Sequence, residues 1–381
     1  MFVEQFRYSP IPSDAQSIRS EVRDFIKENL SHFPMQKRAD SWMGFDSEFS
    51  QKLGQRGWIG MALPKQYGGS DSGAFTRYVV IEELLAAGAP VSAHWFSDRQ
   101  SGFQILQYGQ QSQKDAFLPA ICRGECFFCI GMSEPGSGSD LASIKTRAEK
   151  TANGWVVNGQ KVWTTNAHRS HYMIALVRTG SSESRHGGMS QFIIDLTLPG
   201  ITIRPIKDLT GSEHFNEVFF DNVELTEDAL LGDEGNGWNQ VTGELAMERS
   251  GPERFLSSMT LMYTLIDAIG PTPDAFQARE VGRISARLMT LRQMSLSVTQ
   301  LLENGDNPSV AASCVKDLGS VLEQDIPEIA QQLCDMLPTS SGGGEHALVL
   351  SHLMQQAPSF SLRGGTREIL RGIIARGLGL R

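Results

Sequence analysis

The strings GMSEPGSGSDLASIKTRAEK (131–150) and NGWVVNGQKVWTTNA (153–167) decide which fold this sequence predicts. The first is a Gly/Ser-rich turn after an apolar run, whose backbone can approach a phosphate or a polar ring edge closely. It is neither a P-loop nor a G-x-G-x-x-G fingerprint, and its composition alone is typical of a surface turn. In the second string, two β-rich runs flank Asn158-Gly159, which predicts a hairpin. Its Trp beside two Thr suits a planar cofactor, although such residues are common in ordinary sheet packing.

The residues after these two strings also predict β-strands. Short runs rich in β-branched or aromatic residues follow at 171–178, 190–195, 201–206 and 216–225. Turn signals separate them and no helical stretch lies between them, so a parallel βαβ sheet is not expected. The middle of the chain therefore predicts an antiparallel sheet or barrel.

Helical periodicity marks both ends of the chain. Apolar residues recur at helical spacing in 13–30 and 76–87 before the strands, and in 284–301, 308–337 and 345–356 after them. A loop with Gly and Pro punctuation, 57–69, separates the first two helices. The order α, β, α divides the chain into an N-terminal helical domain (1–120), a middle β domain (121–230) and a C-terminal helical domain (231–381).

Composition excludes several classes of function. The 381 residues are 40% hydrophobic and 20% charged, which is typical of a globular protein with a sizeable core. The formal net charge of -9 and the lack of a basic run argue against nucleic acid and against anionic membrane. No apolar run approaches a membrane span, and the start lacks a signal peptide, so a cytoplasmic protein is expected. Five cysteines do not make a disulfide framework.

Three of the cysteines, Cys122, Cys126 and Cys129, have the spacing C-x3-C-x2-C. That spacing resembles the iron–sulfur motif of radical SAM enzymes. Such enzymes need strands and helices that alternate downstream, whereas here strands follow strands. Small apolar cysteines along a strand and a loop are therefore favoured, and no metal is expected.

An acidic pair lies on a helix predicted from GELAMER (243–249). Glu244 and Glu248 are four residues apart, with apolar Leu245 and Met247 beside them. A desolvated carboxylate here has the raised pKa that a general base needs near neutral pH. On the residues alone, a solvated helix face with an ion pair to Arg249 is favoured.

Taken in order, these segments resemble the acyl-CoA dehydrogenase family. The resemblance runs from GWIGMALPKQYGG (57–69) through the two strings above and NEVFFDNVEL (216–225) to GGTREILRGIIARGLGL (364–380). Its most specific part is Glu-Pro-Gly-x-Gly-Ser-Asp followed by Asn-Gly-x-Lys-x-Trp-x-Thr-Asn. It implies an α+β fold with an N-terminal helical domain, a middle antiparallel β-barrel and a C-terminal four-helix bundle.

The resemblance also implies a reaction and a site. FAD is the expected cofactor, an acyl-CoA thioester the substrate, and electron-transfer flavoprotein the electron acceptor. A carboxylate removes the α-proton while the β-hydride passes to flavin N5. The matching positions for FAD are Ser133, Ser139, Trp163, Thr165, Thr366 and Glu368. Ser139 and Arg249 are the expected contacts to substrate.

The position of the base departs from the commonest pattern. Most members carry it as the Glu of a Glu-Gly-Thr string, which here is Gly364-Gly365-Thr366. A minority, including isovaleryl-CoA dehydrogenase, carry the base on the first helix of the C-terminal domain. The segment 234–249 aligns with that helix without gaps and puts Glu248 at the base position. The resemblance thus makes Glu248 the expected catalytic residue.

A second departure concerns assembly. The family usually has Arg-x-x-Phe-Gly after that helix, and this Arg reaches the FAD pyrophosphate of the neighbouring subunit. Here residues 255–278 contain no Lys or Arg, and the family's Gly-rich segment is reduced to 340–344. An FAD diphosphate buried without its cation is costly. We therefore expect a heterotetramer in which a second subunit supplies the Arg, as in the bacterial α2β2 enzymes that act on steroid side chains.

Three alternatives remain open from the sequence. An oxidase or a reductase on the same fold uses the same residues. A degenerate scaffold subunit fits the loss of the Arg segment, but the retained Glu248 argues against it. A homo-oligomer and the identity of the acyl group, whether from fatty acid or steroid degradation, are also undecided.

Overall fold

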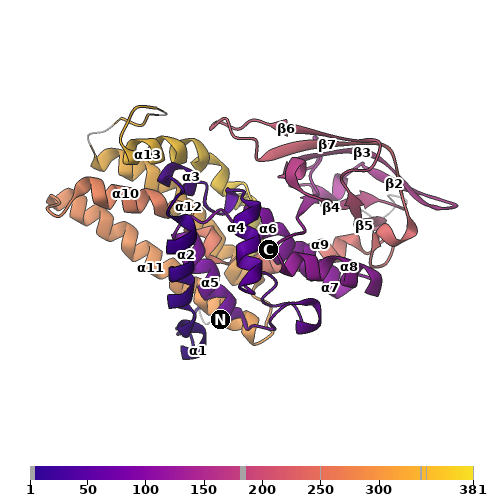
Figure 1. The fold of residues 1–381 in the computed structure, drawn as a ribbon, viewed down its shortest axis with the longest axis horizontal. Helices are drawn as coiled ribbons and strands as arrows, with labels where there is room; N and C mark the ends of the chain where they lie inside the picture. Colours follow the sequence, from indigo (N-terminus) through magenta and orange to yellow (C-terminus); the bar gives the residue numbers. More distant parts are fainter. Residues whose placement is uncertain (1–4, 181–185, 249, 335–336, 340, 381) are drawn as a thin grey trace. The chain divides into compact units, whose positions relative to one another are not determined.

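The computed structural model describes residues 5–180, 186–248, 250–334, 337–339 and 341–380, without the side chains of residues 244–248. The chain forms two compact units, and Figure 1 draws its helices and strands coloured along the sequence. The first comprises Met1–Phe45, Ser72–Val91 and Ala246–Arg381. The second comprises Asp46–Asp71 and Ser92–Leu245. Among the described residues, no helix combines the length and the apolar character needed to cross a membrane.

The first unit is helical. Its α-helices are α1 (Ser13–Ser17), α2 (Arg19–Leu30), α3 (Met35–Arg38), α5 (Ala74–Ala86), α10 (Met259–Ile269), α11 (Ala275–Glu303), α12 (Ser309–Leu333), α13 (Glu345–Gln356) and α14 (Arg367–Gly377). Helix α12 packs against α10, α11, α13 and α14, and α10 packs against α13. The helix predicted over 13–30 is broken at Ile18, which separates α1 from α2.

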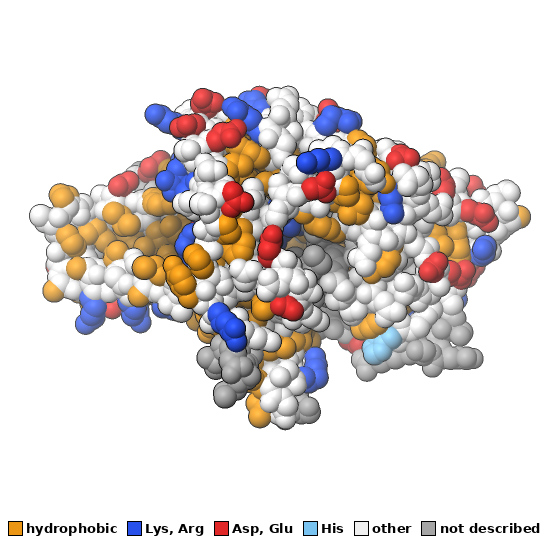
Figure 2. Space-filling model, turned by 90° about the horizontal axis from the view of Figure 1, so that it is seen from below, with side chains coloured by type: hydrophobic (Ala, Val, Ile, Leu, Met, Phe, Trp, Pro, Cys, Tyr) orange, Lys and Arg blue, Asp and Glu red, His pale blue; other side chains and the backbone are white. Residues whose placement is uncertain are grey.

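A buried ion-pair network joins three helices of this unit. Glu82 on α5 is 7% exposed and accepts hydrogen bonds from Arg19 on α2 and from Arg292 on α11. Because a buried carboxylate without partners is costly, these guanidinium groups compensate its desolvation and fix the three helices together. Figure 2 shows hydrophobic side chains gathered at the end of the unit formed by α10 and α11. On these helices, Tyr263 and Ile266 of α10 and Phe276 of α11 are exposed.

The second unit contains the sheet. Its strands are β1 (Phe128–Gly131), β2 (Arg147–Thr151), β3 (Gly154–Thr165), β4 (Tyr172–Arg178), β5 (Met189–Asp195), β6 (Ile201–Ile206), β7 (Phe215–Leu225) and β8 (Leu230–Leu231). They follow the order β6-β7-β3-β2-β4-β5-β8, and β1 pairs with β4. Buried side chains of alternate strand positions, such as Trp155 and Phe192 in edge-to-face contact, form the core on one face.

Three sequence expectations about this sheet are wrong. The sheet is not closed into a barrel, because the described strands β6 and β8 end the order at opposite edges. It is also not wholly antiparallel, since β1 runs parallel to β4. The hairpin predicted at Asn158-Gly159 is absent from the described residues, because β3 is one continuous strand through that point. The turn lies earlier, between Thr151 of β2 and Gly154 of β3.

Helices accompany the sheet in the second unit. They are α4 (Ser47–Gln55), α6 (Ser92–Phe96), a π-helical turn (Ser97–Ser101), α7 (Gly102–Tyr108) and α8 (Gln111–Cys122). The predicted loop 57–69 contains a single 3-10 turn, Lys65–Tyr67. Helix α9 (Gly237–Glu248) begins in this unit and ends with residues counted in the first, and the 3-10 turn Pro252–Arg254 follows it.

Candidate functional site

The end of β3 presents a Trp in a conformation that is rare for this residue. Pairing with β7 is interrupted between Lys161 and Thr164, which is a β-bulge. Trp163 lies in this bulge with φ 59° and is 58% exposed. A left-handed backbone costs an L-residue about 1–2 kcal/mol, so a bulky residue kept there indicates a functional role. Its ring meets Phe215 edge-to-face.

The Ser/Gly-rich loop is hydrogen-bonded to the same bulge. The Val162 N–H donates to the Ser133 carbonyl at 2.9 Å, so that β3 pairs with this loop where it leaves β7. Within the loop, Glu134 and Ser137 exchange two backbone hydrogen bonds. A Cβ added at Gly136 or at Gly138 would meet nothing within 4 Å, so the loop tip leaves open space around its backbone.

A buried ion pair lies beneath this loop. Lys161 Nζ is 2.9 Å from Glu134 Oε1 and also donates to the Met132 carbonyl at 3.0 Å. The Glu134 carboxylate further accepts the N–H groups of Lys145 and Thr146. Burial lowers the pKa of Lys161 to about 8, against the opposing effect of Glu134. Burial alone would raise the pKa of Glu134, but Lys161 and the two N–H donors together lower it.

Buried amides hold the chain beyond Trp163. Asn166 is left-handed, donates its backbone N–H to the His214 carbonyl at 2.7 Å, and donates its side-chain amide to Ser92 Oγ at 2.7 Å. Asn216 on β7 donates to the Thr164 carbonyl at 2.9 Å. The turn that follows β3 is therefore fixed on both sides by side chains with almost no exposure.

The structure brings some of the predicted site residues together. Ser133 and Trp163 are joined through the Val162 hydrogen bond, Ser139 is exposed at the loop, and half-buried Thr165 is two residues beyond Trp163. Together they form an exposed aromatic face beside a Gly-rich loop with open space, which suits a planar ring bearing phosphate groups. On the described residues of the second unit, the fit to FAD is therefore good.

The remaining predicted residues belong to the first unit. Thr366 accepts a hydrogen bond from the Ile369 N–H and caps α14, and Glu368 lies in the first turn of that helix. Hydrogen bonds with its own N–H and with Thr366 lower the pKa of Glu368. Glu248 is the last residue of α9, but its side chain lies outside the described residues, as does Arg249.

A buried guanidinium lies against the Gly364 turn. Gly364 has φ 66°, and a Cβ added to it would lie 3.1 Å from both Nη atoms of Arg254. Arg254 is 2% exposed and lies beside Glu253, with Nε 3.6 Å from Oε1. Arg363, the residue directly before Gly364, donates a hydrogen bond to Glu323, and its guanidinium lies over two aromatic rings.

Sequence reasoning missed the Glu134–Lys161 pair. The sequence contained one signal. Lys161 lies an even number of residues along β3 from Trp155 and Val157, so its side chain is on the same face of the strand as these two, which is the face toward the core. A Lys at a core-facing position requires a buried partner. Nothing in the spacing identifies that partner as Glu134, because a loop and β2 separate the two residues.

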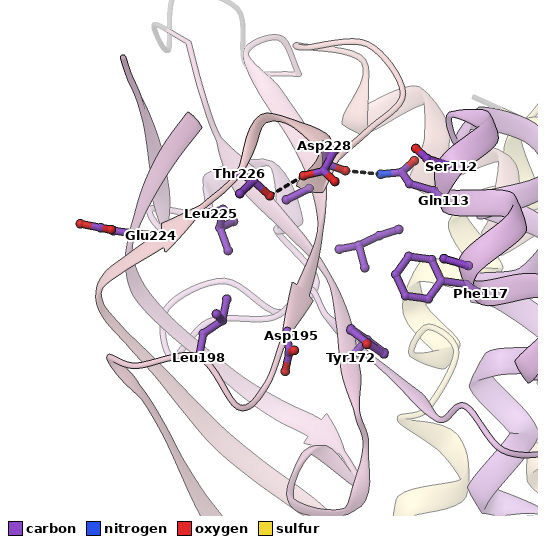
Figure 3. A pocket seen from close by; sticks show the side chains of 13 residues that line it. Ser112, Gln113, Phe117, Tyr172, Asp195, Leu198, Glu224, Leu225, Thr226 and Asp228 are labelled. Carbon is purple, nitrogen blue, oxygen red and sulfur yellow. Dashed lines mark hydrogen bonds between the residues drawn. The ribbon is translucent and has the colours of Figure 1, made fainter. Parts of the chain in front are cut away.

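A cavity of about 290 Å³ lies elsewhere in the second unit. Its walls come from α8, from β4, from β5 and the turn after it, and from the end of β7 with the segment that follows. Phe117, Tyr172 and Leu198 supply apolar surface (Figure 3). None of the predicted site residues whose side chains the structure describes lines it. It therefore does not belong to the site at the end of β3.

The three cysteines give no support to an iron–sulfur cluster. Burial raises the pKa of Cys122 to about 11 and those of Cys126 and Cys129 to about 12, which disfavours the thiolates that bind iron. In the described part of the chain, no group of three His, Cys, Asp or Glu residues is arranged to hold a metal.

Comparison with known proteins identifies the family. Models of the N-terminal, middle and C-terminal domains of acyl-CoA dehydrogenases match residues 12–125, 129–223 and 272–379. The acyl-CoA dehydrogenase IpdE1 of Mycolicibacterium smegmatis is 30% identical, over 96% of this chain and 98% of its own length. The chain belongs to the acyl-CoA dehydrogenase family. Members of this family are FAD-dependent flavoproteins.

Other relatives of this acyl-CoA dehydrogenase family member differ in length or origin. FadE34 of Mycobacterium tuberculosis is 32% identical over 86% of this chain, but the match spans only 45% of FadE34. A chain of the Tcur3481-Tcur3483 steroid ACAD has a TM-score of 0.86 and 25% identity, covering 97% of this chain and 98% of its own. A chain of the ChsE4-ChsE5 complex from Mycobacterium tuberculosis has a TM-score of 0.85 and 26% identity, covering 98% and 99%.

Proposed function

We propose that this chain catalyses the FAD-dependent α,β-dehydrogenation of an acyl-CoA thioester. The observation that carries the proposal is the exposed Trp163, held in a left-handed bulge and hydrogen-bonded through its neighbour Val162 to the Ser/Gly loop. FAD supplies the acceptor for the β-hydride. The chain contributes orientation, with Trp163 packing on the ring system, Thr165 donating to it, and Ser133 and Ser139 on the phosphate side. Thr366 and Glu368 provide further FAD contacts from the start of α14.

The proposed base is Glu248 at the end of α9. Its task is to take the α-proton of the thioester, and Arg249 contacts the substrate beside it. The test is Glu248→Gln, which keeps the size of the side chain but removes its basicity. We expect flavin reduction by substrate to fall by about 10²–10⁴-fold while FAD stays bound. Unchanged flavin reduction in this variant would refute the assignment.

The proposed assembly is an α2β2 heterotetramer with a second dehydrogenase-like subunit. The absence of Lys and Arg from 255–278 supports it, because FAD diphosphate needs a cation from the neighbour. The hydrophobic surface over α10 and α11 and the two heteromeric structural relatives add support. Expressing the chain alone and with its genomic neighbour tests this. Stoichiometric FAD and acyl-CoA oxidation by the chain alone would contradict it.

The electron acceptor and the acyl group belong to the same proposal. Electron-transfer flavoprotein is the proposed acceptor, and anaerobic bleaching of the flavin by substrate followed by air separates a dehydrogenase from an oxidase. A panel of straight-chain, branched and steroid-like CoA thioesters, given to the co-expressed complex, identifies the acyl class. We also retain the three-part division at residues 120 and 230 as a proposal for the domain limits.

A second candidate is a scaffold subunit without catalysis. The missing cations over 255–278 favour it. It predicts that Glu248→Gln leaves the turnover of the complex unchanged, whereas the dehydrogenase proposal predicts its loss.

A further inference from the structure

Strand β3 changes its hydrogen-bonding partner at one point. Lys161 is the last residue that pairs with β7 before the bulge, opposite Val218, and pairing resumes at Thr164, opposite Asn216. In between, the Val162 N–H donates to the Ser133 carbonyl. Trp163 therefore lies where the strand is held by the loop and not by the sheet.

A left-handed conformation at Trp163 needs external support. L-residues disfavour this backbone region, and an exposed indole makes few contacts of its own to hold it. Its edge-to-face contact with Phe215 restrains the ring but not the backbone. The support must come from the residues on either side of the bulge.

The Glu134–Lys161 pair provides that support on the side before the bulge. Lys161 is fully buried, and its ammonium group bonds both the Glu134 carboxylate and the Met132 carbonyl. The same carboxylate receives the N–H groups of Lys145 and Thr146, where the loop returns to the sheet. One carboxylate thus ties both ends of the 132–146 loop to the residue two positions before Trp163.

We infer that Glu134 and Lys161 are positioning residues that orient Trp163 and the 133–139 loop relative to each other before FAD binds. The inference rests on the proposed function, because it gives the two parts of the proposed flavin site one common anchor. Lys161 is fully buried and Glu134 is only 8% exposed, so both act through the backbone that they hold. Preorganisation of this kind lowers the ordering cost that a ligand otherwise meets on binding.

A purely stabilising ion pair is the alternative. Buried ion pairs often add little net stability compared with apolar residues, so burial alone does not explain this one. The two explanations differ in one measurable way. A positioning pair is coupled to Trp163 in FAD binding, whereas a stabilising pair affects every part of the second unit alike.

The decisive experiment is a double-mutant cycle in the co-expressed complex. Lys161→Met, Trp163→Ala and the double variant are compared for FAD affinity by flavin fluorescence. We expect Lys161→Met to weaken FAD binding about tenfold in the presence of Trp163 and no more than about twofold in its absence. The matched control Lys145→Met changes an exposed side chain of the same loop and should leave the affinity unchanged. Equal losses with and without Trp163, or no loss, would overturn the inference.

Hydrogen exchange without flavin separates this inference from the proposed function. In Lys161→Met we expect the Val162 and Ser137 amides to exchange at least about tenfold faster, while amides of the β4–β5 pair keep their wild-type rates. A wild-type Val162 rate in the variant refutes the positioning role, whether or not the complex binds FAD. If Lys161→Met does not fold, Glu134→Gln, which keeps the size of the side chain, takes its place with the same expectations.

Discussion

Moving the proposed catalytic carboxylate from Glu248 to Gly364 is the sharpest test of where this chain can carry a base. Most family members have Glu at that position. If the Gly364 turn could accept a glutamate side chain without strain, Gly364→Glu in a Glu248→Gln background would restore activity. The structure predicts that it will not. The backbone at Gly364 has φ 66°, which costs a residue with a Cβ about 1–2 kcal/mol.

The side chain of Arg254, which lies against Gly364, adds a second cost to the stability of the variant. A Cβ at Gly364 would lie 3.1 Å from both Nη atoms of Arg254, so one of the two groups must move. Arg254 has little free space in which to do so, because it is 2% exposed. The Arg254 guanidinium would lower the pKa of a carboxylate placed beside it, which weakens that carboxylate as a base.

The assay is flavin reduction by acyl-CoA in the co-expressed complex, with urea unfolding beside it. We expect the double variant to reduce flavin within about tenfold of the rate of Glu248→Gln alone. We expect it to be about 1–3 kcal/mol less stable. The control Gly364→Ala carries the backbone strain without a carboxylate. Recovery of a near wild-type rate by the double variant would show that the Gly364 turn accepts a base and that this reasoning is wrong.

Two further predictions concern the second unit. Gly237→Ala should destabilise it by about 1–3 kcal/mol in urea unfolding, because a Cβ there would lie 2.8 Å from Leu176 and 2.9 Å from Ser190 Cα at the start of α9. Gly243→Ala on the same helix, with nothing within 4 Å, should instead be neutral or stabilising, and an equal loss in both would contradict this account. Burial lowers the pKa of His94 to about 4. Between pH 6.5 and about pH 4, His94 is therefore protonated in the unfolded chain but neutral in the folded chain. Wild-type stability should therefore fall by about 3 kcal/mol more than that of His94→Gln between these pH values, and parallel pH profiles would refute it.

Periodicity predicted most elements correctly. The strands at 171–178 and 190–195 and the helix at 345–356 agree with β4, β5 and α13 to within a residue or two at each end. Each of these elements is buried either on one face or along its whole length. The hydrophobic pattern of its sequence therefore matches the burial that the fold gives it. The family strings put Ser133 and Trp163 in the expected FAD site, and the Val162 N–H bonded to the Ser133 carbonyl brings the two segments together. That these residues contact FAD stays a prediction.

The hairpin at Asn158-Gly159 failed for a physical reason. A turn and a bulge both use a glycine with positive φ, and Gly159 has φ 145° within β3. A Cβ at Gly159 would lie 2.6 Å from Thr146 Oγ1, so the glycine permits a close approach of the neighbouring chain. Local sequence does not distinguish a turn from such an approach, because the approaching residue is distant in sequence.

What the sequence by itself determined is the α, β, α order of the elements and the family, and it predicted which residues form the site. The tertiary structure decided that the sheet has open edges. It also decided which groups distant in sequence meet, namely Lys161 with Glu134 and Arg254 with Gly364. The physical reason is that periodicity reports only whether a side chain is buried. Its partner is set by the packing of segments far apart along the chain, and buried charges make that pairing costly to change.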